Sequence, residues 1–532
     1  MESACDAFYR IYKRGERSDA IDNILKQLDF HPLSITLLAT VAHQNRWDTE
    51  RLIREWEGRR TGTLETDHQT SLATTIELSL ASPLFKGLCP GALGLLGVAA
   101  FYPQGIREQN LDWLFPNIPD VTHIFDKFCV LSLTYRSNGF ITMLAPLRDH
   151  LRPKDPKSSP LLCATKERYF TRMSVRVDPN QPGFNDARWI ISEDVNVEHL
   201  LDFFASADPD SKKNWDACVN FIKHLQWHKP RQTVLKSRVE ALPDNHPSKP
   251  ECLYEVASLC GCVGNRPEQI RLLTHVLKLR REQNDDGQVA LTLWRLSIAN
   301  RLLSLRKEGI QRAKEALEMY ERLGDKVQRA RCLDELARLL FDDGQLNAAE
   351  EAAVQSRNLF PEKGHEYEVC QSHRTIGNIY RSRGEKEKAV HHYKLALQMA
   401  STFSWHAHLF WVHFSLADLS LAENQFDDAH TYIKQAKSHA LDNPYNLGRA
   451  ADLHAKILYR QRSFVDATSE VLYALDIFEK VGASNELKIS KALLQDIERE
   501  AKSGATSSGS NTGGESGNCA GTYARQIFPS ST

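Results

Sequence analysis

A repeating spacing of small residues constrains this chain more than any other feature. One alanine recurs at intervals of 40, 40 and 38 residues, as Ala349, Ala389, Ala429 and Ala467. A second small residue stands twelve positions earlier in each copy, as Ala337, Gly377, Ala417 and Ala455. Side chains this small are needed where two helices pack most closely, because larger ones would push the helices apart. The spacing therefore predicts a stack of helix–turn–helix units.

Turn signals and apolar residues complete the unit. About seven residues after the first small residue, the copies carry a turn signal: Gly344, Gly384, Asn424 and Arg462. Apolar residues follow at helical spacing on both sides of the turn, and Pro361 closes one copy. This is the pattern of a tetratricopeptide repeat, on a period longer than the minimal length of roughly 34 residues. The same interval leads back to copies around Ala313 and Ala257, so we expect five to six repeats of about 40 residues.

The repeats predict an all-α fold: an α-solenoid over residues 250–500 with a small N-terminal helical and winged-helix module. Before the array, residues 156–249 contain apolar helix faces between proline-rich turns, which predicts a helical connector. After the array, residues 501–532 are dominated by Ser, Gly, Thr and Asn. Such a segment buries too little apolar area to offset the entropy of ordering, so we expect a disordered tail.

Several helices and one hairpin are predicted before the connector. Ile21–Leu38 is expected to form a helix that stops at His31-Pro32 and resumes, because proline is tolerated in the first turn of a helix. The apolar stretch Gly91–Tyr102 is well short of the roughly 20 residues that cross a bilayer, and predicts a buried core helix. Ser137-Asn138-Gly139 predicts the turn of a short hairpin. Helices followed by a small hairpin suggest a winged-helix domain at residues 65–155.

Two motifs in this N-terminal part resemble those of a known family. HPLSITLLA (His31–Ala39) resembles the Gly-x-Pro-Leu-Ala motif in the helical subdomain after the nucleotide-binding core of NB-ARC proteins, signal-transducing NTPases of the NOD-like receptor (STAND) type. MLAPLRDHL (Met143–Leu151) resembles the winged-helix motif that carries Met-His-Asp in plant members. Fungal members carry a tetratricopeptide array as sensor at the corresponding place. The resemblance extends from about Ile21 to Glu500 and implies that residues 1–64 form the end of an NB-ARC module.

The nucleotide-binding motifs of that family are missing. Its phosphate loop needs Gly-x4-Gly-Lys-Ser/Thr, whose backbone N–H groups and lysine hold the phosphates, and the dipeptide Gly-Lys does not occur in this chain. The histidine and aspartate of Met-His-Asp align with Leu144 and Ala145. His31-Pro32 corresponds to the nucleotide-contacting proline, but one contact without a phosphate loop is not a site. We therefore expect no cofactor and no enzymatic activity.

The charge balance argues against a polyanionic partner. The chain has 67 Lys and Arg against 68 Asp and Glu, so no overall field attracts nucleic acid or an anionic membrane. The basic cluster His228–Arg238 (HKPRQTVLKSR) lacks interleaved aromatic residues, which favours a solvated helix face over a phosphate or nucleic-acid site. Eleven cysteines without regular pairing, and no signal peptide, indicate a reducing, cytoplasmic location.

No metal or cofactor site is predicted. The nearest candidates are three pairs: His391 and His392, Cys260 and Cys262, and Cys370 and His373. Adjacent histidines point about 100° apart on a helix, and neither cysteine-containing pair has a second pair nearby to complete about four ligands. No signature marks a Cys–His hydrolase. Four aromatic residues at partly helical spacing are expected in the core rather than in a cofactor site: Trp405, Phe410, Trp411 and Phe414.

The first helices of such repeats line a groove, which is the best candidate for a binding site. Side chains three residues before, one after and four after the small residue should face it. In three neighbouring repeats these are Asp334, Arg338 and Phe341, then Arg374, Asn378 and Arg381, then Phe414, Asp418 and Leu421. Arginine and asparagine side chains are suited to hold a carboxylate or an extended peptide backbone. The alternative is a solvated repeat face that binds nothing.

These features predict a non-catalytic protein whose repeats bind a protein or peptide. The resemblance implies the regulatory C-terminal portion of an NB-ARC-like receptor, a nucleotide-controlled switch that the repeats hold off until ligand binds. The alternative is a free-standing adaptor of the co-chaperone type, in which Arg374, Asn378 and Arg381 clamp the C-terminal carboxylate of a partner. A third hypothesis is an enzyme fragment whose phosphate loop comes from a partner chain. Ligand and oligomeric state are left open by the sequence.

Overall fold

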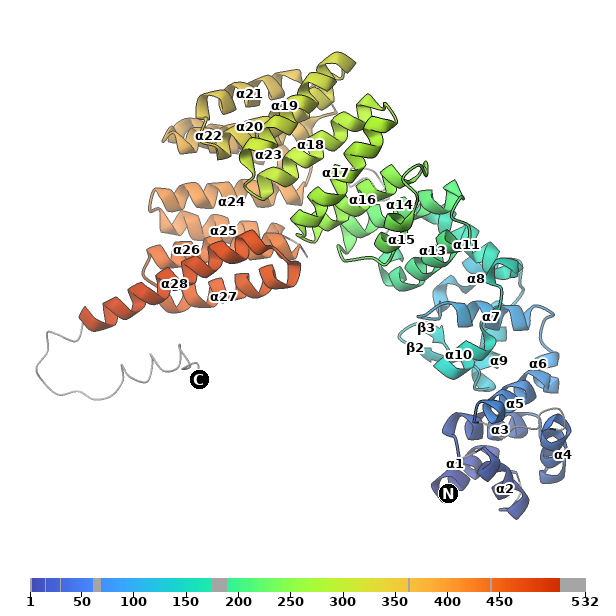
Figure 1. Ribbon diagram of the computed structural model, residues 1–532. Coiled ribbons are helices and arrows are strands. Elements are labelled where there is room, and N and C mark those ends of the chain that lie inside the picture. Colours follow the sequence, from blue (N-terminus) through green and yellow to red (C-terminus); the bar gives the residue numbers. More distant parts are fainter. Residues whose placement is uncertain are drawn as a thin grey trace, which may run out of the picture. The chain divides into compact units, whose positions relative to one another are not determined.

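Helices dominate both of the units into which the chain divides. A computed structural model describes residues 2–14, 16–28, 30–60, 68–174, 189–361, 364–440 and 443–507, in which there are 28 α-helices (Figure 1). One unit comprises residues 1–229 with 233–242, and the other comprises residues 230–232 with 243–532. The predicted all-α class is confirmed for the described part of the chain.

Five helices around one apolar core open the first unit. They are α1 (Glu2–Tyr12), α2 (Asp19–Gln27), α3 (Pro32–Gln44), α4 (Thr49–Arg60) and α5 (His68–Ala81). The predicted break at His31-Pro32 is confirmed: the His31 ring accepts a hydrogen bond from the Ser34 backbone N–H at 3.4 Å, and Pro32 starts α3. In the core, the Tyr12 hydroxyl donates to the carbonyl oxygen of Trp47 at 3.0 Å.

A three-stranded antiparallel sheet follows among short helices. The elements are α6 (Pro83–Lys86), α7 (Ala92–Phe101), β1 (Ile106–Arg107), η1 (Glu108–Asn110), α8 (Leu111–Leu114), α9 (Val121–Val130), β2 (Tyr135–Ser137), β3 (Phe140–Thr142) and α10 (Ala145–Leu151), with strand order β1-β3-β2. The predicted hairpin is confirmed, since Ser137 pairs with Phe140 and the turn residues Asn138 and Gly139 have φ of 51° and 78°. Strand β1 was not predicted. The apolar helix α7 is buried, as expected.

The remaining helices of the first unit hold the basic cluster. They are η2 (Pro156–Ser158), α11 (Pro160–Met173), α12 (Trp189–Ser192), α13 (Asp194–Ala207), α14 (Lys212–His228) and α15 (Leu235–Ala241). Arg238 donates to the Asp202 carboxylate at 2.6 Å, and Lys229 pairs with Asp194 at 3.2 Å. Two cations of the cluster are therefore paired with acids of α13.

The second unit confirms the predicted array as six helix pairs and one further helix. The pairs are α16 (Lys249–Cys262) with α17 (Arg266–Glu282), α18 (Asp286–Leu302) with α19 (Arg306–Leu323), α20 (Lys326–Asp342) with α21 (Leu346–Leu359), α22 (Glu366–Ser382) with α23 (Lys386–Thr402), α24 (His406–Ala422) with α25 (Phe426–His439), and α26 (Pro444–Arg460) with α27 (Phe464–Val481). Helix α28 (Ser484–Ser507) follows. All eight small residues of the sequence repeat are buried within these pairs.

The first helices of the repeats form the inner layer of the array. Successive first helices contact one another, from α18 and α20 through to α24 and α26, more extensively than the second helices do. A helix stack curves toward the side where its helices lie closest together. The helices that carry the predicted groove residues therefore form the inner side of the array.

The first and last repeats touch at a turn glycine. Gly264, between α16 and α17, has φ of 82°, and a Cβ added to it would lie 2.6 Å from the carbonyl oxygen of Val481 at the end of α27. Only glycine combines this backbone conformation with so close an approach. The array therefore closes into one turn, with the first helices on its inner side.

The predicted start of the disordered tail needs a correction. Helix α28 continues to Ser507, seven residues into the segment 501–532, because Leu493 and Ile497 anchor it to the last repeat and further helical residues add at little cost. Residues 508–532 lie outside the described residues. No helix in the described ranges combines the length and the apolar character that crossing a membrane requires.

Candidate functional site

The predicted groove residues lie on three neighbouring inner helices, α20, α22 and α24. Asp334 of α20 is the most enclosed of the charged ones, with 5% of its surface exposed. Its carboxylate accepts hydrogen bonds from Arg338, from the Gln371 amide at 3.2 Å and from the Thr375 hydroxyl at 3.2 Å. Asp334 therefore cross-links α20 to α22, and its oxygens are already satisfied by the protein.

A second pair joins α22 to α24 in the same way. The Arg381 guanidinium forms an ion pair with the Asp418 carboxylate. Nearby, the Asn378 amide oxygen accepts a hydrogen bond from the hydroxyl of Tyr393 on α23 at 2.7 Å, which leaves the amide N–H groups as donors. Asn378 thus keeps its amide N–H groups for a ligand.

The apolar groove residues belong mainly to the cores between repeats. Phe341 packs against the core of the third and fourth repeats, and Leu421 is buried in the core of the fifth and sixth. Phe414 packs against that second core as well but is only half-buried.

Arg374 differs from its neighbours because no described residue forms an ion pair or hydrogen bond with its guanidinium. Its guanidinium carbon lies 5.7 Å from the centroid of the Trp411 ring. Burial, followed by the charge of Arg338, lowers the pKa of Arg374 to about 10. Arg374 is still charged at neutral pH, and its charge lacks a carboxylate partner among these residues.

Unused hydrogen-bond donors extend along the inner layer. Within the described residues, seven buried atoms on first helices have no hydrogen-bond partner. Five can donate, namely Ser258 Oγ, Trp294 Nε1, Arg329 Nε, Arg338 Nε and Arg381 Nε; the other two are Gln288 Oε1, which can only accept, and His413 Nδ1. Buried polar groups are nearly always paired, by protein, water or ligand. Donors outnumber acceptors among these atoms, so the inner layer favours a ligand that is rich in acceptors.

Trp411 and Arg449 belong to the same surface, although sequence analysis did not assign them to it. The Arg449 guanidinium carbon lies 6.0 Å from the ring centroid of Trp411 and 5.4 Å from that of Phe414. Both residues stand six positions before the small residue of their repeat, a position that was not counted as facing the groove. The same spacing in two successive repeats is the signal that could have found them.

The aromatic residues expected in the core fall into two groups. Phe410 is fully buried, which confirms the prediction for that residue. Trp405 is half-buried and stacks on Phe403, with 4.6 Å between ring centroids. Trp411 and Phe414 are partly exposed beneath arginine side chains, so for these two the core assignment holds only in part.

Residues of two of the three candidate pairs make contacts within the repeats. His391 is exposed, whereas His392 is half-buried and its Nδ1 lies 2.9 Å from Nδ1 of His373. The Cys370 thiol donates to the Ala396 carbonyl oxygen at 3.3 Å. Across the described ranges, no three or more His, Cys, Asp and Glu side chains are grouped so as to hold a metal ion.

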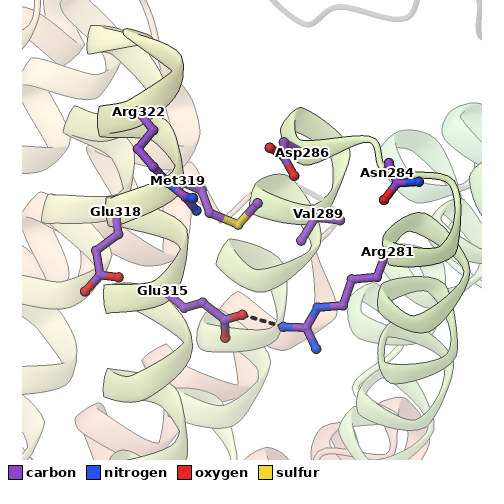
Figure 2. Close-up of a pocket in the computed structure, with 8 residues that line it drawn as sticks. All are labelled: Arg281, Asn284, Asp286, Val289, Glu315, Glu318, Met319 and Arg322. Carbon is purple, nitrogen blue, oxygen red and sulfur yellow. Dashed lines mark hydrogen bonds and ion pairs between the residues drawn. The ribbon is translucent and has the colours of Figure 1, made fainter.

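A small charged cavity lies between the first and second repeats. It has a volume of about 230 Å³ and is lined by residues of α17, α18, α19 and the turn between α17 and α18: Arg281, Asn284, Asp286, Val289, Glu315, Glu318, Met319 and Arg322. Figure 2 shows the ion pair between Arg281 and Glu315 that crosses it. The cavity is lined by both cations and acids, and Arg281 and Glu315 neutralise each other. The cavity is therefore a less specific site than the inner layer.

Comparisons with known proteins give structural likenesses but no family. No family model and no curated protein matches the sequence. A STAND signal-transduction ATPase with a tetratricopeptide-repeat sensor from Pyrococcus horikoshii is similar over 94% of this chain and 73% of its own, at 14% identity and a TM-score of 0.49. A Rap protein in complex with Competence and Sporulation Factor is similar over 63% of this chain and 98% of its own, at 14% identity and a TM-score of 0.41.

A third solved structure is similar at a comparable level. The Rap conjugation gene regulator of plasmid pLS20, in complex with the Phr* peptide, matches 75% of this chain and 98% of its own, at 11% identity and a TM-score of 0.40. None of these scores carries information on function. The fold assignment rests on the helix pairs of the chain itself.

Proposed function

We propose that the repeat array is a recognition module that binds an extended peptide, or a flexible segment of a partner protein, along its inner layer. The observation that carries the proposal is the set of buried donors without partners on first helices, together with the unpaired Arg374. An extended peptide presents backbone carbonyl oxygens at regular intervals, which is the acceptor-rich chemistry that this surface lacks. The role is regulatory rather than catalytic.

A binding experiment tests this proposal. The purified chain is incubated with a pool of short random peptides, and the bound peptides are recovered and measured individually by the change in tryptophan fluorescence. We expect the pool to contain peptides that bind the parent. These peptides should bind the Asn378→Leu variant more weakly, because leucine lacks the amide donors. The proposal fails if the pool yields no peptide that binds above background.

The finer proposal is that this module belongs to an NB-ARC-like signalling protein. It is supported by the motifs at His31–Ala39 and Met143–Leu151 and by helices with a small sheet between them, as a winged-helix domain would have. Leu144, which aligns with the family's nucleotide-contacting histidine, is an exposed residue that precedes α10. We therefore expect no Mg-dependent ATP turnover by the purified chain, and turnover abolished by a point change in the first 150 residues would contradict this.

The second candidate is an adaptor that clamps a C-terminal carboxylate. Arg374 favours it, since no described residue forms an ion pair with it, but the Arg381 guanidinium is already paired with Asp418. Peptides with free and amidated C-termini distinguish the candidates. Loss of binding on amidation supports the clamp, and equal binding supports recognition of an internal segment.

A further inference from the structure

We infer that Arg374, Trp411 and Arg449 form the subsite that receives a carboxylate of the bound segment. This inference rests on the proposed function and adds the chemistry of one contact to it. Arg374 supplies the pairing guanidinium, Trp411 supplies an apolar wall, and Arg449 supplies a second cation.

The three side chains come from consecutive inner helices. Arg374 lies on α22, Trp411 on α24 and Arg449 on α26, and these helices contact one another in that order. The two guanidinium carbons lie 5.7 Å and 6.0 Å from the centroid of the same indole ring. Trp411 therefore fixes the approach of both cations through cation–π contacts, each contributing about 0.5–1 kcal/mol at partly exposed sites.

The local charges leave the subsite with an excess of cation. Arg374 forms no ion pair with a described residue, and Asp334, whose charge acts on it, already accepts hydrogen bonds from three donors. Arg449 lies 3.8 Å from Glu486, which also accepts a hydrogen bond from the Tyr445 hydroxyl at 2.6 Å. A partly desolvated cation without a partner is costly, so a ligand carboxylate that pairs with Arg374 relieves that cost on binding.

The surroundings favour a single carboxylate over a polyanion. Asp418 and Asp452 lie on α24 and α26, and Asp334 lies on the neighbouring first helix α20. Asp452 is already held by Lys456 at 2.7 Å and Ser490 at 2.6 Å. A nucleic acid or polyphosphate would bring phosphates close to these acids, whereas one carboxylate contacts the cationic subsite alone. The carboxylate is either a side chain or the C-terminus of the segment.

The test starts from peptides recovered from a random pool on the parent chain. Each acidic peptide is compared with a version in which Asp and Glu are replaced by Asn and Gln, and with a version amidated at the C-terminus. We expect one of the two changes to weaken binding roughly tenfold, the scale of a charge-assisted hydrogen bond, which also identifies the source of the carboxylate. Indifference to both changes overturns the inference, even though the peptides bind and the proposed function stands.

Variants of the chain supply the matching half of the experiment. Arg374→Gln should bind the acidic peptide and its weaker-binding neutral version, whether Asn/Gln-substituted or amidated, with equal affinity. Arg449→Gln should reduce the difference in affinity between these two peptides. Arg374→Lys should keep part of the preference because it keeps the charge. Arg357→Gln, on the second helix α21, is the matched control and should bind like the parent. A full acid preference in Arg374→Gln overturns the inference; if that variant is unfolded, the peptide changes on the parent decide.

Discussion

The close approach of paired helices depends on single side chains. A Cβ added to Gly377 would lie 2.6 Å from the Tyr393 ring, which is fully buried and held by its hydroxyl bond to Asn378. The sequence predicts this position because a small residue recurs there in every copy. It does not reveal that the opposing atom is an aromatic ring, since that depends on the rotation of one helix against the other.

Gly377→Ala should therefore destabilise the array, although alanine is the better helix former. Overpacking costs about 1–3 kcal/mol, which exceeds the gain of about 1 kcal/mol in helix propensity. Gly287→Ala is the control, because only the Asp285 side chain lies within 4 Å of the added Cβ, at 3.7 Å. Urea unfolding should show a lower midpoint for Gly377→Ala than for the parent, and an equal or higher one for Gly287→Ala. The reverse order would refute this packing account.

Buried histidines give the array a defined response to acid. Burial, followed by the charge of His439, lowers the pKa of His413 to about 4. In the unfolded chain a histidine has a pKa of about 6.5. As the pH falls, the unfolded state is therefore protonated first, so the stability that His413 contributes is present above ~6.5 and is lost between ~6.5 and ~4.

His413→Phe should weaken this pH dependence while keeping an aromatic ring beside Tyr432 and His439. The free energy of unfolding, measured in urea between about pH 7 and about pH 5, should fall in the parent by up to ~1.4 kcal/mol more per pH unit than in the variant. Equal slopes would show that His413 is not protonated preferentially on unfolding.

At the scale of elements, the turns were the most predictable part of the array. Gly344, Gly384, Asn424 and Arg462 all have positive φ, between 56° and 80°. The contacts between repeats were less predictable. Arg381 meets Asp418 and Asp334 meets Thr375 across roughly one repeat, so charge and hydroxyl pairs at that separation could have been sought. That Trp411 and Arg449 are neighbours follows only from the order in which the first helices pack.

A comparison of two turn glycines distinguishes the cost of backbone strain from the cost of a lost contact between elements. Gly264 and Gly344 have φ of 82° and 80°, but an added Cβ meets Val481 at 2.6 Å only in the first case and nothing within 4 Å in the second. Alanine at either position should cost about 1–2 kcal/mol for the left-handed backbone. Gly264→Ala should lower the free energy of unfolding by about 1–3 kcal/mol more, because the added Cβ also clashes with the last repeat. Equal thermal midpoints for the two variants would mean that this contact contributes nothing to stability.

At the scale of the whole molecule, the repeat period predicted five to six helix pairs, of which the described residues contain six, but it did not predict the closure of the array. The contact between Gly264 and Val481 joins the two ends of the solenoid, and no local pattern encodes it, because it depends on the accumulated rotation of all the repeats. Closure turns the first helices toward one interior, where the unpaired donors and Arg374 lie. A linear stack with the same residues would leave them in open solvent.

Photo-crosslinking of a bound peptide tests the central claim most directly. A peptide recovered from the random pool is synthesised with a photoreactive phenylalanine analogue at successive positions, and the crosslinked residues are identified by mass spectrometry. The account predicts crosslinks on the first helices, from α18 to α26, with the acidic end of the peptide nearest to α22 and α24. Crosslinks confined to the second helices, or to residues 1–229, would contradict it.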